Sequence, residues 1–236
     1  MLLKIEDLDC RIASSQILRA CSLNVERGEI VSLLGRNGAG KTSTLKNIIG
    51  LYSPQNGKIT FKDKDITTAS SRARVLMGIG YSPEDSRLFP ELTVAENIKL
   101  GFWISKDTER AESFDMEKAF HIFPALKNLY NRLANNLSGG EKKMVAISRA
   151  LALNPSLLLL DESMEGLSPR VVKSFSEAIK TIRKDLGASV LLAESNIYNA
   201  SRLADRAYII ERGEIYFEGT PQQILQDKQL LTLVGK

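Results

Sequence analysis

The segment GRNGAGKT, residues 35–42, decides the fold, because it matches the pattern G-x-x-x-x-G-K-[ST]. The residues before it, EIVSLLG (29–35), are rich in β-branched and leucine side chains, as in a buried parallel strand. After it, Leu45 and Ile48 stand at helical spacing, and Gly50 is a stop signal. The sequence therefore predicts a strand, a glycine-rich loop and a helix in direct succession.

This loop has the composition of a phosphate-binding loop. Its glycines let the backbone curl so that successive N–H groups point at phosphate oxygens, and the following helix N-terminus adds partial positive charge. Lys41 would reach the β- and γ-phosphates of a nucleoside triphosphate, and the Thr42 hydroxyl would bind Mg²⁺. The residues predicted to bind the nucleotide are Gly35, Arg36, Asn37, Gly38, Ala39, Gly40, Lys41, Thr42 and Ser43.

Two adjacent carboxylates follow 120 residues later, at the end of LLLLD (157–161), a short apolar run typical of a buried strand. Strand ends lie beside the phosphate loop in parallel α/β sheets. Asp161 would hold Mg²⁺ through water, and Glu162 would orient or deprotonate the attacking water. An apolar run with two acids by itself indicates only a strand that reaches solvent, so the phosphate loop is what makes this pair informative.

A third segment, LSGGE (137–141), precedes an apolar-periodic helix. Ser138 and Glu141 form the S-x-x-E pattern of a helix capping box. That pattern does not explain Gly139 and Gly140, which lower helix stability. Two glycines at a helix start are expected where a phosphate must approach the backbone, so the segment predicts a second anion site.

In this order and spacing, the three segments resemble the nucleotide-binding subunit of an ATP-binding cassette (ABC) ATPase over essentially the whole chain. The resemblance implies an α/β fold with a P-loop NTPase (RecA-like) core and an N-terminal antiparallel β subdomain. It also implies one domain over residues 1–236, with a helical subdomain inserted at roughly 85–150. In that family two cassettes pack head to tail with two ATP molecules between them. Ser138, Gly139 and Gly140 would then contact ATP held by the other copy.

Three segments are similar to the branched-chain amino-acid importer ATPases: GYSPEDSRLFPELTVAENI (80–98), LLLLDESMEGLSP (157–169) and LLAESN (191–196). The resemblance implies that Glu84 senses Mg²⁺ and the γ-phosphate. It also implies that Ile12 stands where the family usually has an adenine-stacking aromatic residue. The implied partners are a second ATPase subunit, either the same chain or a sister, and separate transmembrane permease subunits.

Three further positions depart from the family pattern. Ser163 replaces the proline after the catalytic glutamate, and Ser168 replaces the aspartate of the next loop. Ser195 replaces the histidine that usually contacts the γ-phosphate, and a serine donates a hydrogen bond but carries no charge. We therefore expect slow basal hydrolysis, with Ser195 acting beside Glu162.

Composition excludes several other classes of protein. The net charge is +4, and the 32 basic and 28 acidic residues are interspersed, so nucleic-acid binding is not expected. His121 is the only histidine, and Cys10 and Cys21 do not form a CxxC pair, which argues against a histidine metal site or a redox motif. No apolar run approaches the ~20 residues of a membrane span. We expect a cytoplasmic protein that is peripheral on the inner face of the membrane through its permease.

The leading hypothesis is an ATP-hydrolysing motor subunit of a membrane importer for branched-chain amino acids or similar polar solutes, with ATP and Mg²⁺ as cofactors. Two alternatives stay open. One is a soluble ABC ATPase that acts on DNA or ribosomes. The other is a scaffold that closes on ATP but hardly hydrolyses it, suggested by Ser163, Ser168 and Ser195.

Overall fold

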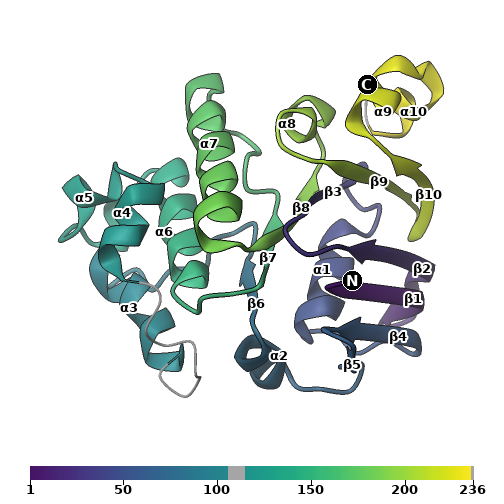
Figure 1. Ribbon diagram of the computed structural model, residues 1–236, viewed down its shortest axis with the longest axis horizontal. Helices are drawn as coiled ribbons and strands as arrows, with labels where there is room; N and C mark the ends of the chain where they lie inside the picture. The colour runs from purple at the N-terminus through teal and green to yellow at the C-terminus, as the bar shows by residue number, and fades with distance from the viewer. Residues whose placement is uncertain (106–114, 235–236) are drawn as a thin grey trace.

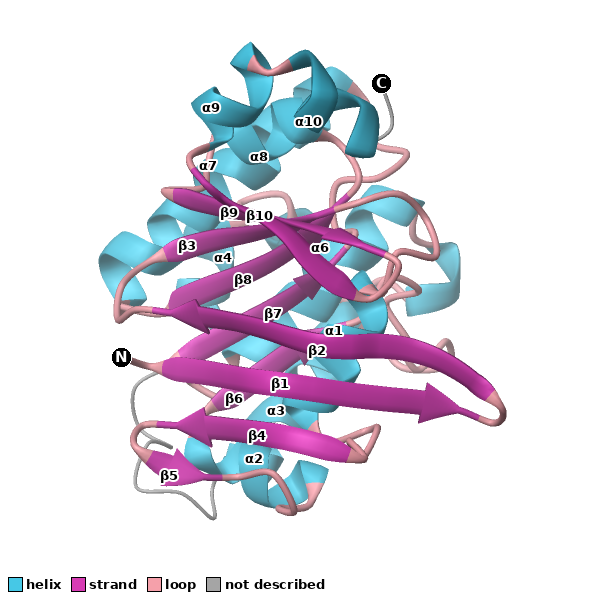
Figure 2. Cartoon of the chain, turned by 90° about the vertical axis from the view of Figure 1, so that its right-hand side faces the viewer, coloured by secondary structure: helices cyan, strands magenta, loops and turns pink. Residues whose placement is uncertain are grey.

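A computed structural model describes residues 1–105 and 115–234. Its strands form two sheets, an antiparallel sheet near the N-terminus and a mainly parallel sheet through the centre of the molecule (Figures 1 and 2). This α/β arrangement confirms the predicted fold class. Part of the region expected to be the helical subdomain, residues 106–114, lies outside the described residues.

The antiparallel sheet has the strand order β2-β1-β4-β5. The core of the sheet is the long hairpin of β1 and β2, which pairs Leu3 with Val25 and Ile12 with Ser15. Along β1 the buried and exposed side chains largely alternate, as expected for a strand with one solvated face. Its strands are β1 (Leu3–Ile12), β2 (Ser15–Val25), β4 (Asn56–Phe61) and β5 (Lys64–Asp65).

The central sheet has the order β10-β9-β3-β8-β7-β6 and is parallel except for β10. In β3, β7 and β8 every residue is buried, which agrees with their near-continuous apolar sequences. Because these strands are parallel, their carboxyl ends meet at one edge, where Leu34 pairs with Glu194 and Asp161 with Ala193. The strands are β3 (Ile30–Leu34), β6 (Ile79–Ser82), β7 (Leu157–Asp161), β8 (Ser189–Glu194), β9 (Arg206–Glu211) and β10 (Glu214–Gly219).

Helix α1 (Lys41–Ile49) lies between the two sheets. Its apolar face, with Leu45 and Ile48, joins buried residues of the antiparallel sheet and of one face of the central sheet in a single cluster. Gly50 ends the helix in the left-handed conformation, as its position after the apolar stripe predicts. The strand–loop–helix unit predicted from GRNGAGKT is therefore confirmed.

The other face of the central sheet is covered by helices α3 to α7, on the side away from the antiparallel sheet (Figure 1). Thr93 and Glu96 form the capping hydrogen bonds at the start of α3. Smaller helices pack at the other ends of the sheets. The helices besides α1 are α2 (Ser71–Met77), α3 (Val94–Ser105), α4 (Met116–Ile122), α5 (Leu126–Leu129), η1 (Ala134–Asn136), α6 (Gly139–Leu151), α7 (Pro169–Leu186), α8 (Ile197–Ser201), α9 (Pro221–Gln226) and α10 (Lys228–Leu233).

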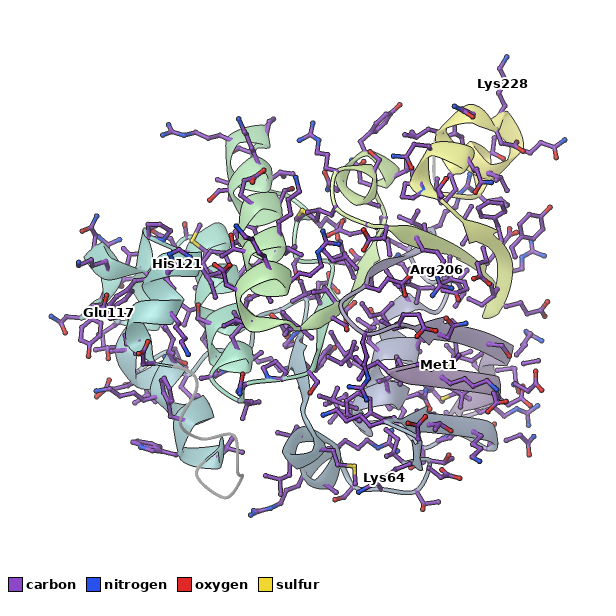
Figure 3. The ribbon with its side chains drawn as sticks, in the orientation of Figure 1. Met1, Lys64, Glu117, His121, Arg206 and Lys228 are labelled. Atoms are coloured by element: carbon purple, nitrogen blue, oxygen red, sulfur yellow. The ribbon has the colours of Figure 1, made fainter. Side chains whose placement is uncertain are left out.

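Arg206, labelled in Figure 3, joins the two sheets electrostatically. From β9 its guanidinium pairs with Glu29 at 2.8 Å and donates to the Asn24 side chain of β2 at 2.7 Å. The hydrogen bonds to Glu29 and Glu218 raise the pKa of Arg206 further, so its guanidinium stays charged. Across the described ranges, no helix has the length and apolar character needed to cross a membrane.

Candidate active site

The phosphate loop joins β3 to α1 and has the backbone geometry that its glycines allow. Gly38 and Gly40 have φ angles of +81° and +118°, a region that side-chain-bearing residues rarely adopt. Gly35 is required by packing, since a Cβ there would lie 2.4 Å from the Ile210 carbonyl oxygen. The loop thus directs its N–H groups and the start of α1 toward one side, as in an anion-binding loop.

Lys41 is the buried cation of this loop, with 4% of its surface exposed. Its Nζ donates to the carbonyl oxygens of Gly35 at 2.8 Å and Arg36 at 3.2 Å. It also lies 3.0 Å from both Ser195 Oγ and Glu162 Oε1. Lys41 and Glu162, 121 positions apart in the sequence, therefore form a buried ion pair at the centre of the site.

Thr42 and Asp161 meet directly, as predicted for two groups at one metal. Thr42 Oγ1 donates to Asp161 Oδ1 at 3.0 Å, and the Tyr81 hydroxyl donates to Asp161 Oδ2 at 3.0 Å. Burial raises the pKa of Asp161, while these two hydrogen bonds act in the opposite direction. A cation bound at this carboxylate would relieve that burial cost.

Glu162 directly follows the end of β7 and is 6% exposed. It has a φ of +45°, in the left-handed region, and its N–H donates to the Ala193 carbonyl of β8 at 2.9 Å. Burial opposes ionisation of its carboxyl, but hydrogen bonds from Glu165 and Lys41 and the Lys41 charge outweigh this and lower its pKa. Glu162 is thus ionised and held beside the phosphate loop.

Glu84 approaches from the loop after β6. A pocket of about 400 Å³ is lined by Glu84, Glu162 and phosphate-loop residues that include Lys41 and Thr42. A neighbouring cavity of about 360 Å³ is lined by Thr42, Glu84 and Asp161, among others. The three residues predicted to hold Mg²⁺ therefore share one cavity, and their oxygens are the donor type that this cation prefers.

Ser195 lies at the centre of the site, as its sequence position suggested. Besides Lys41, its hydroxyl contacts Asn37 Oδ1 at 3.1 Å and Glu162 Oε1 at 3.2 Å. Ile12 is 39% exposed at the end of β1 and is not among the residues that line the 400 Å³ pocket. Ile17, which sequence reasoning did not consider, is the apolar side chain from β2 that does line it.

The segment LSGGE begins α6. Ser138 and Glu141 make both hydrogen bonds of the predicted capping box. A Cβ at Gly139 would meet nothing within 4 Å, so packing inside this chain does not require glycine there. Ser138, Gly139 and Gly140 are not among the residues lining either cavity beside the phosphate loop.

The structure adds three residues to the predicted site. Tyr81 contacts Asp161, and Glu165 shares a hydrogen bond with Glu162 that, with burial, raises the Glu165 pKa to about 7. Lys143 of α6 donates to the carbonyls of Glu162 and Glu165. A lysine on a helix surface and a tyrosine in a strand carry no sequence signal for such roles.

A family model described as ABC transporter matches residues 18–165. The chain belongs to the ABC transporter family. It is 38% identical over 216 residues to the high-affinity branched-chain amino acid transport ATP-binding protein BraG of Pseudomonas aeruginosa, covering 91% of each chain. It is 36% identical over 233 residues to the lipopolysaccharide export system ATP-binding protein LptB of Haemophilus influenzae, covering 97% and 95% of the two chains.

Among solved structures, the ADP conformation of MJ1267, an ATP-binding cassette of an ABC transporter, matches with a TM-score of 0.85 and 26% identity. The match covers 100% of this chain and 99% of that one. As a member of the ABC transporter family, the chain is an ATPase and the ATP-binding subunit of a transporter. The resemblance to ABC ATPases is thereby confirmed.

Proposed function

We propose that this ABC ATPase hydrolyses ATP with Glu162 as the residue that orients or deprotonates the attacking water. The observation that supports this most directly is the convergence of Lys41, Glu162 and Ser195 within about 3 Å of one another. Because this buried carboxylate is ionised, it can accept a hydrogen bond or a proton from the attacking water.

Binding of the triphosphate requires an exchange of partners at Lys41. Its ammonium reaches the β- and γ-phosphates only by leaving the carboxylate of Glu162, which is then released toward the water. Ser195 and Asn37 remain as neutral groups beside the γ-phosphate. Water adds to the γ-phosphorus, the bond to the β-phosphate oxygen breaks, and ADP and phosphate leave.

Mg²⁺ fits this site as a cofactor. Thr42, Asp161 and Glu84 supply hydroxyl and carboxylate oxygens around one cavity. When bound, the cation neutralises charge on the β- and γ-phosphates. The residues of this chain position the oxygens that would bind it: Thr42 and Asp161 orient each other, and Tyr81 fixes the second oxygen of Asp161.

The signature segment acts on a second cassette in this proposal. Ser138, Gly139 and Gly140 open a helix whose first N–H groups suit an anion, and the open space at Gly139 lets a phosphate approach the backbone. The chain has its own phosphate loop, so a partner's ATP is the proposed ligand. Two cassettes arranged head to tail would close over two ATP molecules and reopen after hydrolysis.

The cavity beside Glu84 is also lined by Arg87 and by the exposed Leu51, and Phe89, two residues after Arg87, is a second exposed apolar residue. We assign this region to contact with a transmembrane permease, since Glu84 lies in the same cavity and would transmit the ATP state. The chain would then be peripheral on the cytoplasmic side of a membrane. Import of branched-chain amino acids or similar polar solutes is the proposed transport function, on the resemblance to BraG. Export of an LptB-like cargo is the alternative.

Size-exclusion chromatography of wild type and Glu162→Gln with Mg-ATP, sampled over time, tests the proposal. We expect the variant to form a lasting dimer, because ATP is bound but not cleaved. The wild type should dimerise and return to monomer as phosphate appears. Persistent dimers of both proteins without phosphate release would favour an ATP-gated scaffold instead. Rapid hydrolysis by Glu162→Gln would remove the role assigned to Glu162.

A further inference from the structure

Lys143 links the signature helix to the residue proposed to activate water. It is half-buried on α6, four residues after Gly139. Its Nζ donates to the Glu162 carbonyl oxygen at 2.6 Å and to the Glu165 carbonyl oxygen at 3.1 Å. One ammonium group thus holds both ends of the short turn that follows β7.

That turn contains backbone that needs support. Glu162 has a φ of +45° although it is not glycine, and a residue with a side chain is strained in this left-handed region. The N–H of Glu162 is fixed by the Ala193 carbonyl, and the N–H of Glu165 turns back to the Glu162 carbonyl at 3.3 Å. Lys143 is the side chain that fixes the Glu162 carbonyl from outside the turn. Without it, the Glu162 carbonyl would keep only the weak contact from the Glu165 N–H, and the backbone that carries the Glu162 side chain would be held less firmly.

Several carboxylates lie near the Lys143 ammonium group. The carboxylates that favour its charged form are Glu194, Glu165, Glu84 and Glu162, although burial is the larger influence and lowers its pKa. These nearby carboxylates together balance the charge of the ammonium group. Its hydrogens are directed at the two backbone carbonyls. A charged donor makes stronger hydrogen bonds than a neutral one.

We propose that Lys143 is a positioning residue for ATP hydrolysis, which holds the backbone of Glu162 from the signature helix of the same chain. This inference rests on the catalytic role proposed for Glu162. It adds a mechanical consequence, because any rotation of α6 on binding a partner's ATP moves the donor that sets the Glu162 backbone. Signature engagement at the start of α6 is thereby linked to the catalytic glutamate through Lys143, one helical turn further along.

If Lys143 only stabilised the fold, its loss would affect folding but would not change kcat selectively relative to the affinity for nucleotide. The phosphate-loop residues, which provide the main contacts proposed for ATP, are not contacted by the Lys143 ammonium in its hydrogen bonds. Loss of Lys143 should therefore change kcat and leave the affinity for nucleotide nearly unchanged. Restoring a charged donor at the same place should restore turnover.

The test compares Lys143→Met, Lys143→Gln and Lys143→Arg with Lys173→Met, an exposed lysine on α7, as the charge-loss control. Phosphate release gives kcat, calorimetry with Mg²⁺ and AMP-PNP gives Kd, and thermal unfolding gives Tm. We expect Lys143→Met to lower kcat about 10- to 100-fold, as for a displaced catalytic group, with Kd within about threefold of wild type. Lys143→Arg, which retains charge and several donors, should recover kcat to within about fivefold.

An unchanged kcat in folded Lys143→Met overturns the proposal, as does an equal loss in Lys143→Arg at wild-type Tm. If Lys143→Met does not fold, Lys143→Gln decides: a lowered kcat at wild-type Tm supports positioning, and a wild-type kcat contradicts it. Glu162→Gln is measured in parallel. Activity in that variant refutes the proposed role of Glu162, whereas an inactive Glu162→Gln with an active Lys143→Met refutes only the inference about Lys143.

Discussion

At Lys41, four protein oxygens surround one ammonium group: two backbone carbonyls, the Ser195 hydroxyl and the Glu162 carboxylate. Of these, only the carboxylate carries a charge, so it is the contact that a phosphate most readily replaces at the same position. The ion pair therefore neutralises the buried Lys41 cation. When a phosphate replaces the carboxylate at Lys41, Glu162 is released to its proposed catalytic position. A buried pair of this kind gives little net stability but a strong preference for one geometry.

Ser195 places a neutral hydroxyl where the family usually has a histidine. Its contacts with Lys41 and Glu162 are ordinary hydrogen bonds of 3.0 and 3.2 Å. We expect Ser195→Ala to lower kcat about 10- to 100-fold, since hydrogen bonds to charged groups contribute about 1.5–3 kcal/mol and about 1.4 kcal/mol is tenfold in rate. Phosphate release at saturating Mg-ATP checks this, with the exposed Ser174→Ala as control. A change of less than twofold would show that Ser195 does not act in turnover.

Glu194 provides a pH-dependent prediction. This carboxyl is 1% exposed at the end of β8, and burial raises its pKa from 4.5 to about 7. Between these values the folded protein binds more protons than the unfolded chain, so the free energy of unfolding falls as pH rises through this window. Glu194→Gln removes this loss and keeps an oxygen for the Met164 N–H. The stability of Glu194→Gln relative to wild type should thus rise by about 3 kcal/mol from pH 4.5 to pH 8.

Urea unfolding of the two proteins at several pH values measures that difference. Titrating groups that are not coupled to Glu194 contribute equally to both proteins and cancel in the comparison. A difference that is independent of pH would mean that Glu194 ionises in the folded protein as it does in the unfolded chain. Since Glu194 precedes Ser195, phosphate release by Glu194→Gln at one pH shows whether the substitution also disturbs the site.

Helix α6 is the element that connects the most parts of the site. Its first turn carries the capping box, Lys143 reaches the turn after β7, and Arg149 donates to the carbonyls of Ser86 and Arg87. Ser86 and Arg87 both have positive φ angles and follow Glu84 by two and three residues. One helix thus supports the backbone around both Glu84 and Glu162.

Helix α1 depends on a buried cation from another element. Arg74 of α2 is 1% exposed, and its Nη1 donates to the carbonyls of Asn47 and Ile48 in the last turn of α1. The rest of its guanidinium bonds Thr67 and Ala69. These contacts give the Ile48 carbonyl a donor and the Asn47 carbonyl a second one, besides the Gly50 N–H, at the end of α1.

We expect Arg74→Met to lower the free energy of unfolding by about 3 kcal/mol, because buried carbonyls lose a charged donor. Urea unfolding measures the change, and Arg19→Met, at an exposed position of β2, is the matched control. Equal midpoints for the two variants would show that the carbonyls find other donors. A selective loss in Arg74→Met would confirm that α1 is held at its C-terminus from α2.

The sequence predicted these elements well wherever local pattern determines them. The phosphate loop, the apolar strand before Asp161 and the glycine after α1 follow from periodicity, turn chemistry and caps. It predicted neither Arg74 nor Lys143, since a basic residue on an amphipathic helix usually faces solvent. Their partners are backbone carbonyls, including those at the end of α1 and in the turn after β7, which any residue supplies, and so only the folded chain brings them together.

At the scale of the whole molecule, the signature segment and the phosphate loop serve different sites. The loop and Glu162 line one cavity, and Thr42 and Asp161 line its neighbour, whereas a Cβ at Gly139 would meet no described residue within 4 Å. The proposed head-to-tail pairing explains that separation, because each complete site then combines the loop of one cassette with the signature of the other.

A mixing experiment tests the pairing directly. Lys41→Ala removes the phosphate contact of the home site, and Gly139→Asp places a negative charge where a partner's phosphate would approach. Each variant alone should be inactive, since every site in its homodimer carries the defect. In the mixed dimer, one site carries both defects and the other carries neither. An equimolar mixture with random pairing should therefore recover about a quarter of the wild-type rate of phosphate release.

The control mixes Lys41→Ala with Glu162→Gln, which lie on the same side of each site and leave no intact combination. Recovery in that control as well would contradict the head-to-tail pairing, because the control leaves no intact site. No recovery in either mixture would place the signature segment at its own chain's ATP.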